Sequence, residues 1–256
     1  MEIITSRKNP YIKELAALKK NKSSDMVLIE GHKLIFEARE SGIAPKVILV
    51  SDSYKGDISN LCANDTRVIQ VNDEIIDLLS STNTPQGIIA LIKRREKIDI
   101  AEVVIKRGVY LVLDRVADPG NVGTIIRTSE ALGASGVVLT PGCADIYNEK
   151  TLRATMGSAF RQNIYYSKSA FDAVDMLRGC GAKAYAAALG EKNVLLGREV
   201  LPDFCAFVIG NEASGVSQEA ISACDSAIMI PMTGKTESLN AAVAASVILW
   251  ETFRAR

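Results

Sequence analysis

The sequence has little histidine, and this scarcity excludes several kinds of catalytic site. His32 is the only histidine among 256 residues. A zinc site built from several histidines is therefore excluded, and a hydrolase triad would have to depend on this one side chain. The cysteines are odd in number and contain no Cys-x-x-Cys pair; they are Cys62, Cys143, Cys180, Cys205 and Cys224. We therefore expect reduced, mostly buried thiols and no metal site.

Net charge and long apolar runs are also missing. Lys and Arg together number 30, as do Asp and Glu. A nucleic-acid partner must therefore be bound by a local basic patch and not by the field of the whole chain. The longest mostly apolar run, Ala241 to Trp250, has ten residues and is too short to span a bilayer. With no export signal at the N-terminus, these absences predict a cytoplasmic protein without a membrane partner.

Short apolar runs alternate with amphipathic segments along the whole chain. Strands are predicted at 26–30, 46–50, 67–71, 87–92, 110–114, 137–140, 163–166, 183–188, 204–209 and 227–230. Helices are predicted between them, for example at 33–40 and 74–79, and a long one from about 238 to 253. Because the strands are almost continuously apolar, we expect parallel α/β sheets in both halves.

A charged stretch interrupts this alternation after residue 92. Residues 93–97 read Lys-Arg-Arg-Glu-Lys, and the pattern begins again at Val109. We therefore predict a linker over about 93–107 that joins a small α/β domain, residues 1–95, to a larger α/β domain, residues 107–256.

The first 22 residues form a locally basic segment. It contains six Lys or Arg residues against two Glu, among them Arg7, Lys8 and Lys13. Asn9-Pro10 predicts the start of a helix that carries Lys13. A solvated surface helix explains such a charge run, and so does a face that contacts RNA phosphates. Both interpretations stay open at this point.

The second half contains three glycine-bearing junctions, each of which follows a predicted strand. At the first, Asp114 leads through Pro119-Gly120 into a helix predicted to begin near Asn121. Gly120 and Gly123 permit close backbone approach, and the first helical turn offers N–H groups to an anion. A simple strand-to-helix turn is the alternative. The segment supplies neither G-x-G-x-x-G nor a P-loop, so a nicotinamide dinucleotide site or a nucleotide triphosphate site is not indicated.

The other two junctions lie at 207–217 and 228–240. In the former, Gly210 and Gly215 flank Glu212 directly after a buried strand, where open α/β sheets bind their ligands. In the latter, a strand runs into a small polar loop and then the C-terminal helix, for which Ser238 is a plausible N-cap. Capping by Ser238 leaves Asn240 unexplained, since an asparagine amide favours a cap or loop over a helix interior.

The order of the three junctions and the residues within them together resemble the motifs of one known family. N-x-G-x-x-x-R at Asn121–Arg127, I-G-N-E-x-x-G at Ile209–Gly215 and I-P-M-x-G-x-x-x-S-L-N at Ile230–Asn240 look like the signature motifs of SpoU/TrmH RNA 2′-O-ribose methyltransferases. The segment Arg153–Arg161 is similar to another stretch of that family. In the N-terminal half, Glu30-Gly31 and Thr84-Pro85-Gln86-Gly87 resemble its small, ribosomal-protein-like substrate-binding domain, less diagnostically.

This resemblance implies a fold, a cofactor and an assembly. The fold would be a parallel-sheet α/β domain with a deep trefoil knot, the SPOUT fold, which is rare among proteins. The knot would form the S-adenosylmethionine site, and the C-terminal helix would pack in a homodimer. The residues expected to bind this cofactor are Leu189, Gly190, Gly210, Ile230 and Leu239.

The resemblance also implies an active site and RNA contacts. Methyl transfer from a sulfonium to a ribose 2′-hydroxyl needs alignment and help with proton removal, but no metal. The expected catalytic residues are Asn121, Arg127, Glu212, Ser238 and Asn240. Free guanidinium resists deprotonation, so we give Arg127 a role in positioning the ribose-phosphate and stabilising alkoxide charge, with Asn121 and Glu212 orienting it. The expected RNA contacts are Arg7, Lys8, Lys13, His32, Arg153 and Arg161, although a structural role is the alternative for His32.

Three functional alternatives remain beside a ribosomal RNA methyltransferase. A tRNA 2′-O-methyltransferase would share the catalytic domain, but the extra N-terminal domain resembles that of rRNA-modifying members. An inactive RNA-binding protein of the same fold is the second, although all the expected site residues are present. A nucleotide-binding oxidoreductase is the third, and it lacks its glycine fingerprint.

Overall fold

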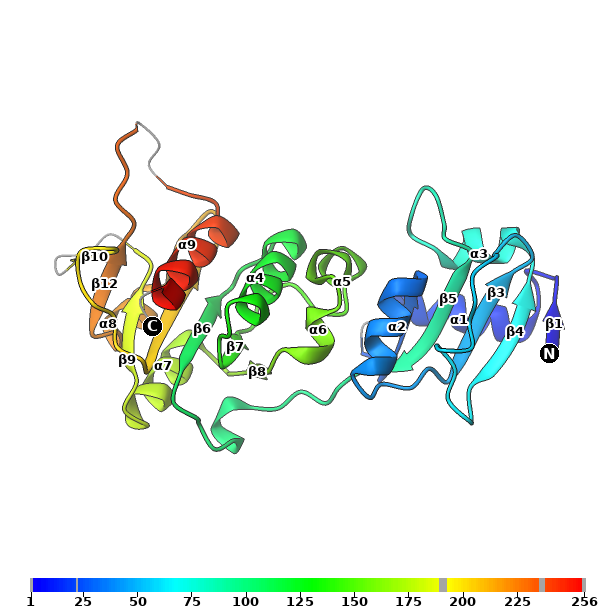
Figure 1. Ribbon diagram of the computed structural model, residues 1–256, viewed down its shortest axis with the longest axis horizontal. Helices are drawn as coiled ribbons and strands as arrows, with labels where there is room; N and C mark the ends of the chain where they lie inside the picture. Colours follow the sequence, from blue (N-terminus) through cyan, green and yellow to red (C-terminus); the bar gives the residue numbers. More distant parts are fainter. Residues whose placement is uncertain (1, 22, 189–192, 235–237, 255–256) are drawn as a thin grey trace. The chain divides into compact units, whose positions relative to one another are not determined.

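The chain forms two compact units, each with its own β-sheet. The computed structural model describes residues 2–21, 23–188, 193–234 and 238–254 (Figure 1). The units are Met1–Glu96 and Lys97–Arg256. Among the described residues, no helix is both long and apolar enough to cross a membrane.

The N-terminal unit is built on a five-stranded sheet in the order β1-β4-β3-β5-β2. The strands are β1 (Glu2–Ile4), β2 (Met26–Glu30), β3 (Val47–Ser51), β4 (Arg67–Val71) and β5 (Ile88–Lys93). Strand β5 pairs antiparallel with both β2 and β3, so the expectation of a purely parallel sheet is wrong for this unit. An apolar run does not reveal strand direction, because a strand covered on both faces is apolar whichever way it runs.

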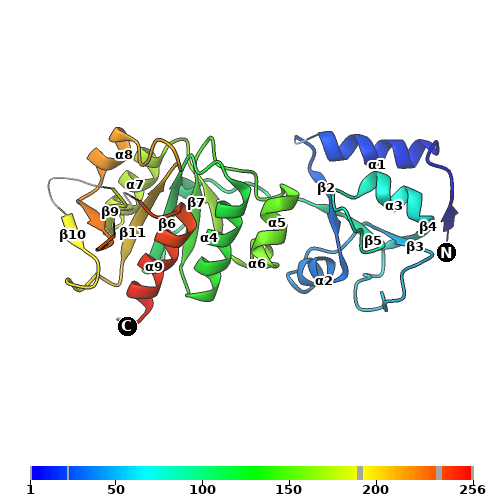
Figure 2. The same ribbon diagram turned by 90° about the horizontal axis from the view of Figure 1, so that it is seen from above.

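Three helices cover the N-terminal sheet. Helices α1 (Pro10–Lys20) and α3 (Asp73–Leu79) pack together on one face, and α2 (His32–Glu40) lies on the other (Figure 2). The predicted start of α1 is confirmed, since the Asn9 side chain accepts from the Tyr11 N–H and Pro10 stands in the first turn. Ile12 and Leu15 on its inner face are fully buried, which leaves its charged residues on the outside.

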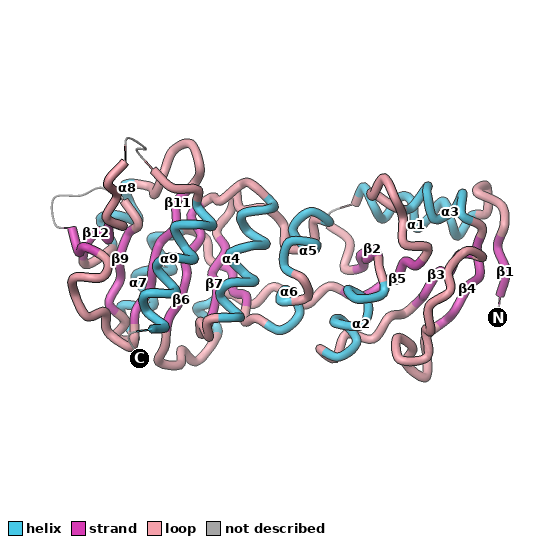
Figure 3. The backbone as a smooth tube through the Cα atoms, turned by 45° about the horizontal axis from the view of Figure 1, so that its top comes forward, coloured by secondary structure: helices cyan, strands magenta, loops and turns pink. Residues whose placement is uncertain are grey.

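The C-terminal unit contains a seven-stranded sheet in the order β10-β12-β9-β11-β6-β7-β8. Figure 3 shows β12, β9, β11, β6 and β7 of this sheet side by side. Its strands are β6 (Val109–Asp114), β7 (Gly136–Leu139), β8 (Ile164–Tyr166), β9 (Lys183–Ala186), β10 (Asn193–Leu195), β11 (Cys205–Gly210) and β12 (Ser226–Met229). Every strand pair is parallel, which confirms the prediction for this half. Strands β1 and β10, each of three residues, were not predicted.

Helices cover both faces of the seven-stranded sheet. One face carries α4 (Pro119–Ala131), α5 (Glu149–Thr155), α6 (Ser158–Arg161) and α9 (Ala241–Arg254). The other carries the short 3₁₀ helix η1 (Ile100–Glu102), α7 (Ala170–Gly179) and α8 (Gln218–Ala223) (Figure 2). A core of small and branched side chains, including Val112, Val138 and Val208, fills the space beneath α7 and α8.

Part of the expected linker packs onto the C-terminal unit. Ile100 is 1% exposed within the core under α7, and Val103 and Ile105 pack against the same core. The Tyr166 N–H donates to the Ile98 carbonyl at 2.9 Å. The predicted linker therefore extends too far toward the C-terminus. The short apolar pattern was missed because it directly follows the charged residues 93–97.

Candidate active site

The candidate site lies where the carboxyl ends of β6 and β11 meet. These two strands are paired, with Asp114 opposite Gly210. The chain leaves β6 toward α4 on one face of the sheet and leaves β11 toward α8 on the other. Such a divergence opens a crevice at the carboxyl edge of a parallel sheet, where ligands bind.

A carboxylate joins the first two junctions at this edge. Glu212 accepts a hydrogen bond from Asn121 Nδ2 at 2.8 Å. It also accepts from the backbone N–H groups of Ala117 and Asp118, both at 3.3 Å. The loop that carries Glu212 is closed by the reciprocal backbone bonds between Asn211 and Gly215. Glu212 is thereby fixed between two loops that lie about ninety residues apart in sequence.

The environment of Glu212 favours its ionised form. Burial raises the pKa of this carboxyl, but the hydrogen bonds from Asn121 and from the backbone N–H groups outweigh it and lower the pKa below 4.5. A carboxylate that accepts several N–H groups is expected to behave in this way. Glu212 is therefore an anion at neutral pH.

Its negative charge fixes the direction of a longer hydrogen-bond chain. An ionised carboxylate can only accept, so Asn121 must turn its NH₂ group toward Glu212 and its Oδ1 away. Asn240 Nδ2 donates to that Oδ1 at 2.9 Å. Asn240 Oδ1 then faces the other way and accepts from the N–H groups of Ala242 and Val243 at 2.9 and 3.2 Å. Glu212, Asn121 and Asn240 thus form a single polar chain in which each amide has one possible orientation.

The bonds of Asn240 identify it as the N-cap of α9. Its side-chain oxygen satisfies the first free N–H groups of that helix, and its carbonyl accepts from Ala244. The prediction that Ser238 caps a helix beginning at 238 is therefore wrong, because the helix begins at Ala241. Ser238 is exposed and lies two residues before the cap. The anomaly in the sequence, an asparagine that does not suit a helix interior, was the correct signal for the cap.

Helix α4 also begins earlier than predicted. Its N-cap is Asp118, whose Oδ1 accepts from the Asn121 N–H at 2.9 Å, and Pro119 occupies the first turn. This bond is the main reason that the Asp118 pKa is lowered, and Lys150, whose Nζ lies 3.2 Å from Asp118 Oδ2, adds to it. The anion at this helix start is therefore the protein's own Asp118, so an external anion is not needed to explain the turn.

Two glycines of the motifs are required by close packing. A Cβ on Gly123 would lie 2.6 Å from both the Ala154 Cβ and the Thr151 carbonyl, so this glycine lets α5 approach α4. A Cβ on Gly210 would lie 2.2 Å from backbone atoms of Gly215 and Val216. Gly210 therefore allows the Glu212 loop to fold back against the end of β11, which sets the position of the carboxylate.

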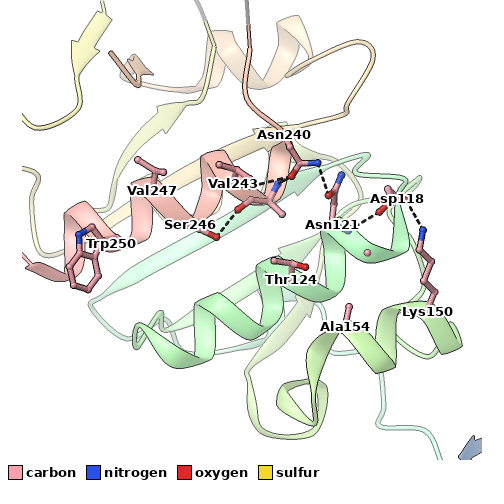
Figure 4. A pocket seen from close by; sticks show the side chains of 12 residues that line it. Asp118, Asn121, Thr124, Lys150, Ala154, Asn240, Val243, Ser246, Val247 and Trp250 are labelled. Atoms are coloured by element: carbon pink, nitrogen blue, oxygen red, sulfur yellow. Dashed lines mark hydrogen bonds and ion pairs between the residues drawn. The ribbon is translucent and has the colours of Figure 1, made fainter. Parts of the chain in front are cut away.

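A groove runs from this polar chain along α9. It lies between α4, α5 and α9 and has a volume of about 620 Å³. Figure 4 shows Asn121, Asn240, Asp118 and Lys150 at one end and Trp250 at the other. Val243 and Trp250, which line the groove, and Phe253, whose ring contacts Trp250, are about half exposed.

The expected cofactor residues are only partly described. Leu189 and Gly190 lie outside the described residues. Gly210 ends β11, Ile230 follows β12 and Leu239 lies just before α9. Met232 and Leu239 are 42% and 36% exposed at this carboxyl edge. Apolar side chains left open beside a polar loop fit a ligand that is part apolar and part polar, as S-adenosylmethionine is.

Arg127 is not brought into the polar chain. It lies six residues after Asn121 on α4, which places it about 240° around the helix. Arg127 is exposed, and its side chain makes no hydrogen bond or ion pair with the described residues. Within one chain, the structure therefore does not bring Arg127 together with Asn121 and Glu212, and their role in orienting it stays a prediction. The two side chains are bound to each other, and Glu212 is also held by backbone N–H groups.

The expected RNA contacts are spread over both units. Arg7, Lys8, Lys13 and Arg153 are exposed. Arg161 forms an ion pair with Glu130, which also accepts from Ser158 and whose pKa is lowered, mainly by Arg161. His32 Nδ1 lies 2.6 Å from the Tyr54 hydroxyl, and the two rings are stacked.

Sequence reasoning missed two residues that hold the site together. Asn211 Nδ2 donates to the Arg115 carbonyl at 2.8 Å, and its Oδ1 accepts from the N–H groups of Ala213 and Ser214. Asp118 caps α4. The signal for Asp118 was present, because an Asp before Pro-Gly is typical of an N-cap followed by a first-turn proline. Asn211 is a letter of the second motif, but no local signal indicates its bond to a carbonyl 96 positions away.

Within the described ranges, no group of three or more His, Cys, Asp or Glu side chains is arranged to hold a metal ion.

Comparison with known proteins supplies a family for this arrangement. Residues 108–250 match the model of the SpoU rRNA Methylase family, and residues 9–90 match the MRM3-like substrate binding domain. The chain is 34% identical to the 23S rRNA (guanosine(2553)-2′-O)-methyltransferase RlmP of Bacillus subtilis, over 98% of both chains. It is 31% identical to the 23S rRNA (uridine(2479)-2′-O)-methyltransferase of Streptomyces viridochromogenes, over 74% of this chain and 68% of that one. Its fold superposes with a TM-score of 0.87 on an AdoMet-bound rRNA methyltransferase from Sinorhizobium meliloti, at 29% identity and over 99% and 97% of the two chains.

Proposed function

The chain belongs to the SpoU rRNA methylase family, and from this premise we propose that it transfers a methyl group from S-adenosylmethionine to a ribose 2′-hydroxyl of large-subunit rRNA. One observation carries the proposal beyond family membership. The hydrogen-bonded chain Glu212–Asn121–Asn240 contains one residue from each of the three motifs. These bonds hold the three motif loops in one arrangement, as the alignment of a ribose for methyl transfer requires.

The polar chain has a positioning role in this proposal. When bound, S-adenosylmethionine supplies an activated methyl group, so the protein has to align the 2′-hydroxyl and assist the loss of its proton. Glu212 fixes the Asn121 amide, which in turn fixes Asn240 at the start of α9. Ser238 lies in the same loop and is proposed to contact the ribose. The cofactor is proposed to contact Gly210, Ile230 and Leu239, together with Leu189 and Gly190.

Arg127 is proposed to stabilise negative charge that develops on the 2′-oxygen. A guanidinium stays protonated and suits this task better than proton abstraction. Because Arg127 lies on a different face of α4 from Asn121, we propose that it serves the site of a second copy. The half-exposed Val243, Trp250 and Phe253 of α9 offer an apolar surface for that copy. The assembly is accordingly proposed to be a homodimer.

The N-terminal unit is proposed to be the RNA substrate-binding domain, residues 1–95, and residues 107–256 the methyltransferase domain. Its contacts with RNA would come from Arg7, Lys8, Lys13 and His32, while Arg153 and Arg161 would add contacts from the other domain. Two of the relatives named above act on 23S rRNA, so 23S rRNA is proposed over tRNA. A cytoplasmic location is proposed with it. The trefoil knot stays a prediction.

Methyl transfer to RNA from a Bacillus subtilis strain that lacks RlmP tests the function directly. We expect labelled methyl from S-adenosylmethionine in 23S rRNA and one new phosphodiester bond that resists alkaline cleavage. Resistance at guanosine 2553 would identify the specificity of RlmP, and resistance at another nucleotide would identify a different one. Label in tRNA alone would replace the rRNA assignment. Absence of label, from protein that also fails to bind S-adenosylmethionine, would overturn the proposal.

The role of Arg127 has its own test. Arg127→Lys keeps the charge but changes its geometry, and we expect a large loss of turnover with RNA affinity retained. Mixing Arg127→Ala with Glu212→Ala protein should then restore part of the activity, because one site of a mixed dimer would contain both native residues. No recovery from stable mixed dimers would place Arg127 in its own chain's site.

A further inference from the structure

A second pocket lies at the same edge of the sheet but on the side covered by α7 and α8. It has a volume of about 400 Å³ and is lined by the residues that follow β6, β7 and β8 and by the first turns of α7 and α8. Arg115, Lys168, Phe171 and Glu219 are its most distinctive side chains. None of these four residues belongs to the motif positions assigned above to catalysis or cofactor binding.

Arg115 is held in this pocket by an unusual backbone. Its φ is 57°, a left-handed conformation that few residues other than glycine adopt. The Arg115 N–H donates to Thr140 Oγ1 at 3.1 Å, and its carbonyl accepts from Asn211. Its Nε lies 3.1 Å from Asp114 Oδ1. The terminal nitrogens of this guanidinium make no hydrogen bond or ion pair with the described residues, so a fixed cation presents free donors.

The other side of the pocket combines a second cation with an aromatic ring. Lys168 is exposed and makes no hydrogen bond or ion pair to a side chain in the described part of the chain. Phe171, in the first turn of α7, is 44% exposed. An exposed ring beside two cations is the combination that binds a nucleotide of single-stranded RNA, because every base can stack on an aromatic face while its phosphate meets Arg or Lys.

The loop that carries Arg115 also borders the candidate active site. Arg115 is two residues from Ala117, whose N–H donates to Glu212, so their Cα atoms are at most about 7 Å apart. The Arg115 carbonyl and the Glu212 loop are also joined through Asn211. A ligand in the pocket would therefore lie next to a nucleotide whose ribose occupies the active site.

We propose that this pocket binds an rRNA nucleotide adjacent to the one that is methylated, an inference that rests on the proposed function. The base stacks on Phe171, and its phosphate contacts Arg115 and Lys168. The two acidic residues of the pocket agree with this placement. Asp114 is occupied by Arg115 and by the Ser217 N–H at 2.7 Å. Glu219, at the start of α8, repels a phosphate, so the phosphate is placed on the Arg115 side of the pocket. The Glu219 carboxylate can accept a hydrogen bond from a base amino group.

Substitution of Phe171 tests the stacking. Binding of a 23S rRNA transcript is measured by filter retention, which needs no turnover, and methyl transfer is measured in parallel. We expect Phe171→Ala to weaken binding and raise the KM for RNA roughly tenfold, with kcat and the affinity for S-adenosylmethionine unchanged. Phe171→Tyr keeps a ring and should restore both values. Val104→Ala removes an apolar side chain that is 92% exposed on the same unit and should change neither.

Substitution of the cations tests the phosphate contact. Removing one cation from a phosphate should reduce the dependence of log Kd on log salt by slightly less than one. We therefore expect Arg115→Ala and Lys168→Ala each to flatten this dependence, whereas Lys106→Ala, an exposed lysine before the other end of β6, should leave it unchanged. Arg115→Gly, which suits the left-handed backbone, repeats the test without strain.

The outcomes separate this inference from the proposed function. RNA binding that is equal in Phe171→Ala and Val104→Ala, or a salt dependence unaffected by both cation substitutions, overturns the pocket assignment even if the wild-type protein methylates rRNA. Conversely, a wild-type protein without methyl transfer, whose RNA binding still depends on Phe171 and the two cations, overturns the proposed function and keeps an RNA-nucleotide pocket.

Discussion

Each unit contains a glutamate that accepts several hydrogen bonds from loop residues, and the two glutamates differ in the partners they bind. In the N-terminal unit, Glu30 at the end of β2 accepts from Ser80 Oγ at 2.6 Å, Thr82 Oγ1 at 2.9 Å and the Gln86 N–H at 3.2 Å. In the C-terminal unit, Glu212 accepts from Asn121 and from two backbone N–H groups. All partners of Glu30 belong to one loop, 80–86, whereas those of Glu212 continue through Asn121 to the cap of another helix.

Similar hydrogen bonds thus stabilise the conformation of one loop in the N-terminal unit and align the side chains of the candidate site in the C-terminal unit. The Glu30 bonds end at hydroxyls and one backbone N–H, so they give the loop its form. Glu212 binds the Asn121 amide, whose oxygen in turn accepts from Asn240. The carboxylate therefore sets the orientation of groups that it does not contact. We therefore expect perturbation of Glu30 to affect RNA binding and perturbation of Glu212 to affect catalysis.

The sharpest test of this comparison is the pair Glu212→Gln and Glu30→Gln. Asn121 Nδ2 and the Ala117 N–H donate to different oxygens of Glu212. Glutamine replaces one of these oxygens with an NH₂ group, so one of the two donors loses its acceptor and the alignment of the polar chain is disturbed. Since misalignment by about 1 Å can cost roughly 100-fold in rate, we expect kcat to fall by roughly that factor in Glu212→Gln. Glu30→Gln should leave kcat unchanged and raise the KM for RNA a few-fold. Equal losses of the single-turnover rate constant in the two variants would show that the two carboxylates do not differ in role.

A glycine within two residues of each glutamate gives a second comparison. A Cβ on Gly210 would overlap backbone, whereas a Cβ on Gly31, at φ 99°, would meet the flexible end of the Gln86 side chain at 2.8 Å. We expect Gly210→Ala to lower the free energy of unfolding by about 2 kcal/mol, measured by urea denaturation, and Gly31→Ala to lower it by about 1 kcal/mol through backbone strain. Gly179→Ala, with open space around it, is the control and should be neutral or stabilising.

Substitutions of Asn240 separate its two tasks. Asn240→Ala removes both the cap of α9 and the bond to Asn121, so we expect about 1 kcal/mol of destabilisation together with loss of activity. Asn240→Asp keeps a capping oxygen but loses the NH₂ donor, so stability should be close to wild type while activity still falls. Thermal unfolding and methyl transfer measured on both variants check this. An active Asn240→Asp enzyme would show that the Asn121 bond is dispensable.

The smallest expected effect is a dependence of stability on pH that arises from Glu212. Its pKa is lower in the folded protein than the ordinary 4.5, so its contribution to stability is complete above that value and is lost as pH falls through the lower pKa. The contribution is small because the carboxylate is exposed. The Tm difference between wild type and Glu212→Gln should therefore shrink on acidification below about pH 4.5. A difference that grows toward acid pH would contradict the sign of the shift.

Much of the site was readable from the sequence because its residues sit at strand ends. Asn121, Glu212 and Asn240 each follow an apolar strand, and parallel strands bring their carboxyl ends to one edge. The same pattern predicted a parallel sheet in both halves, which is correct for the C-terminal sheet and wrong for β5 in the N-terminal one, so it does not determine strand direction. Arg127 shows where this reasoning stops, since a spacing of six residues does not say which helix face meets the site until the helix start is fixed by Asp118.

The sequence by itself determined the family, the α/β class and the residues that gather at the carboxyl edge, since apolar pattern and motif wording are local properties of the chain. Only the tertiary structure decided which of these groups pair, hydrogen-bond or share a pocket. It showed that β5 runs antiparallel, that Asn240 rather than Ser238 caps α9, and that Arg115 lines a second pocket. The physical reason is that strand direction, helix phase and hydrogen-bond direction depend on groups that are distant in sequence. Asn240 and Asn121, for example, are bonded across 119 positions.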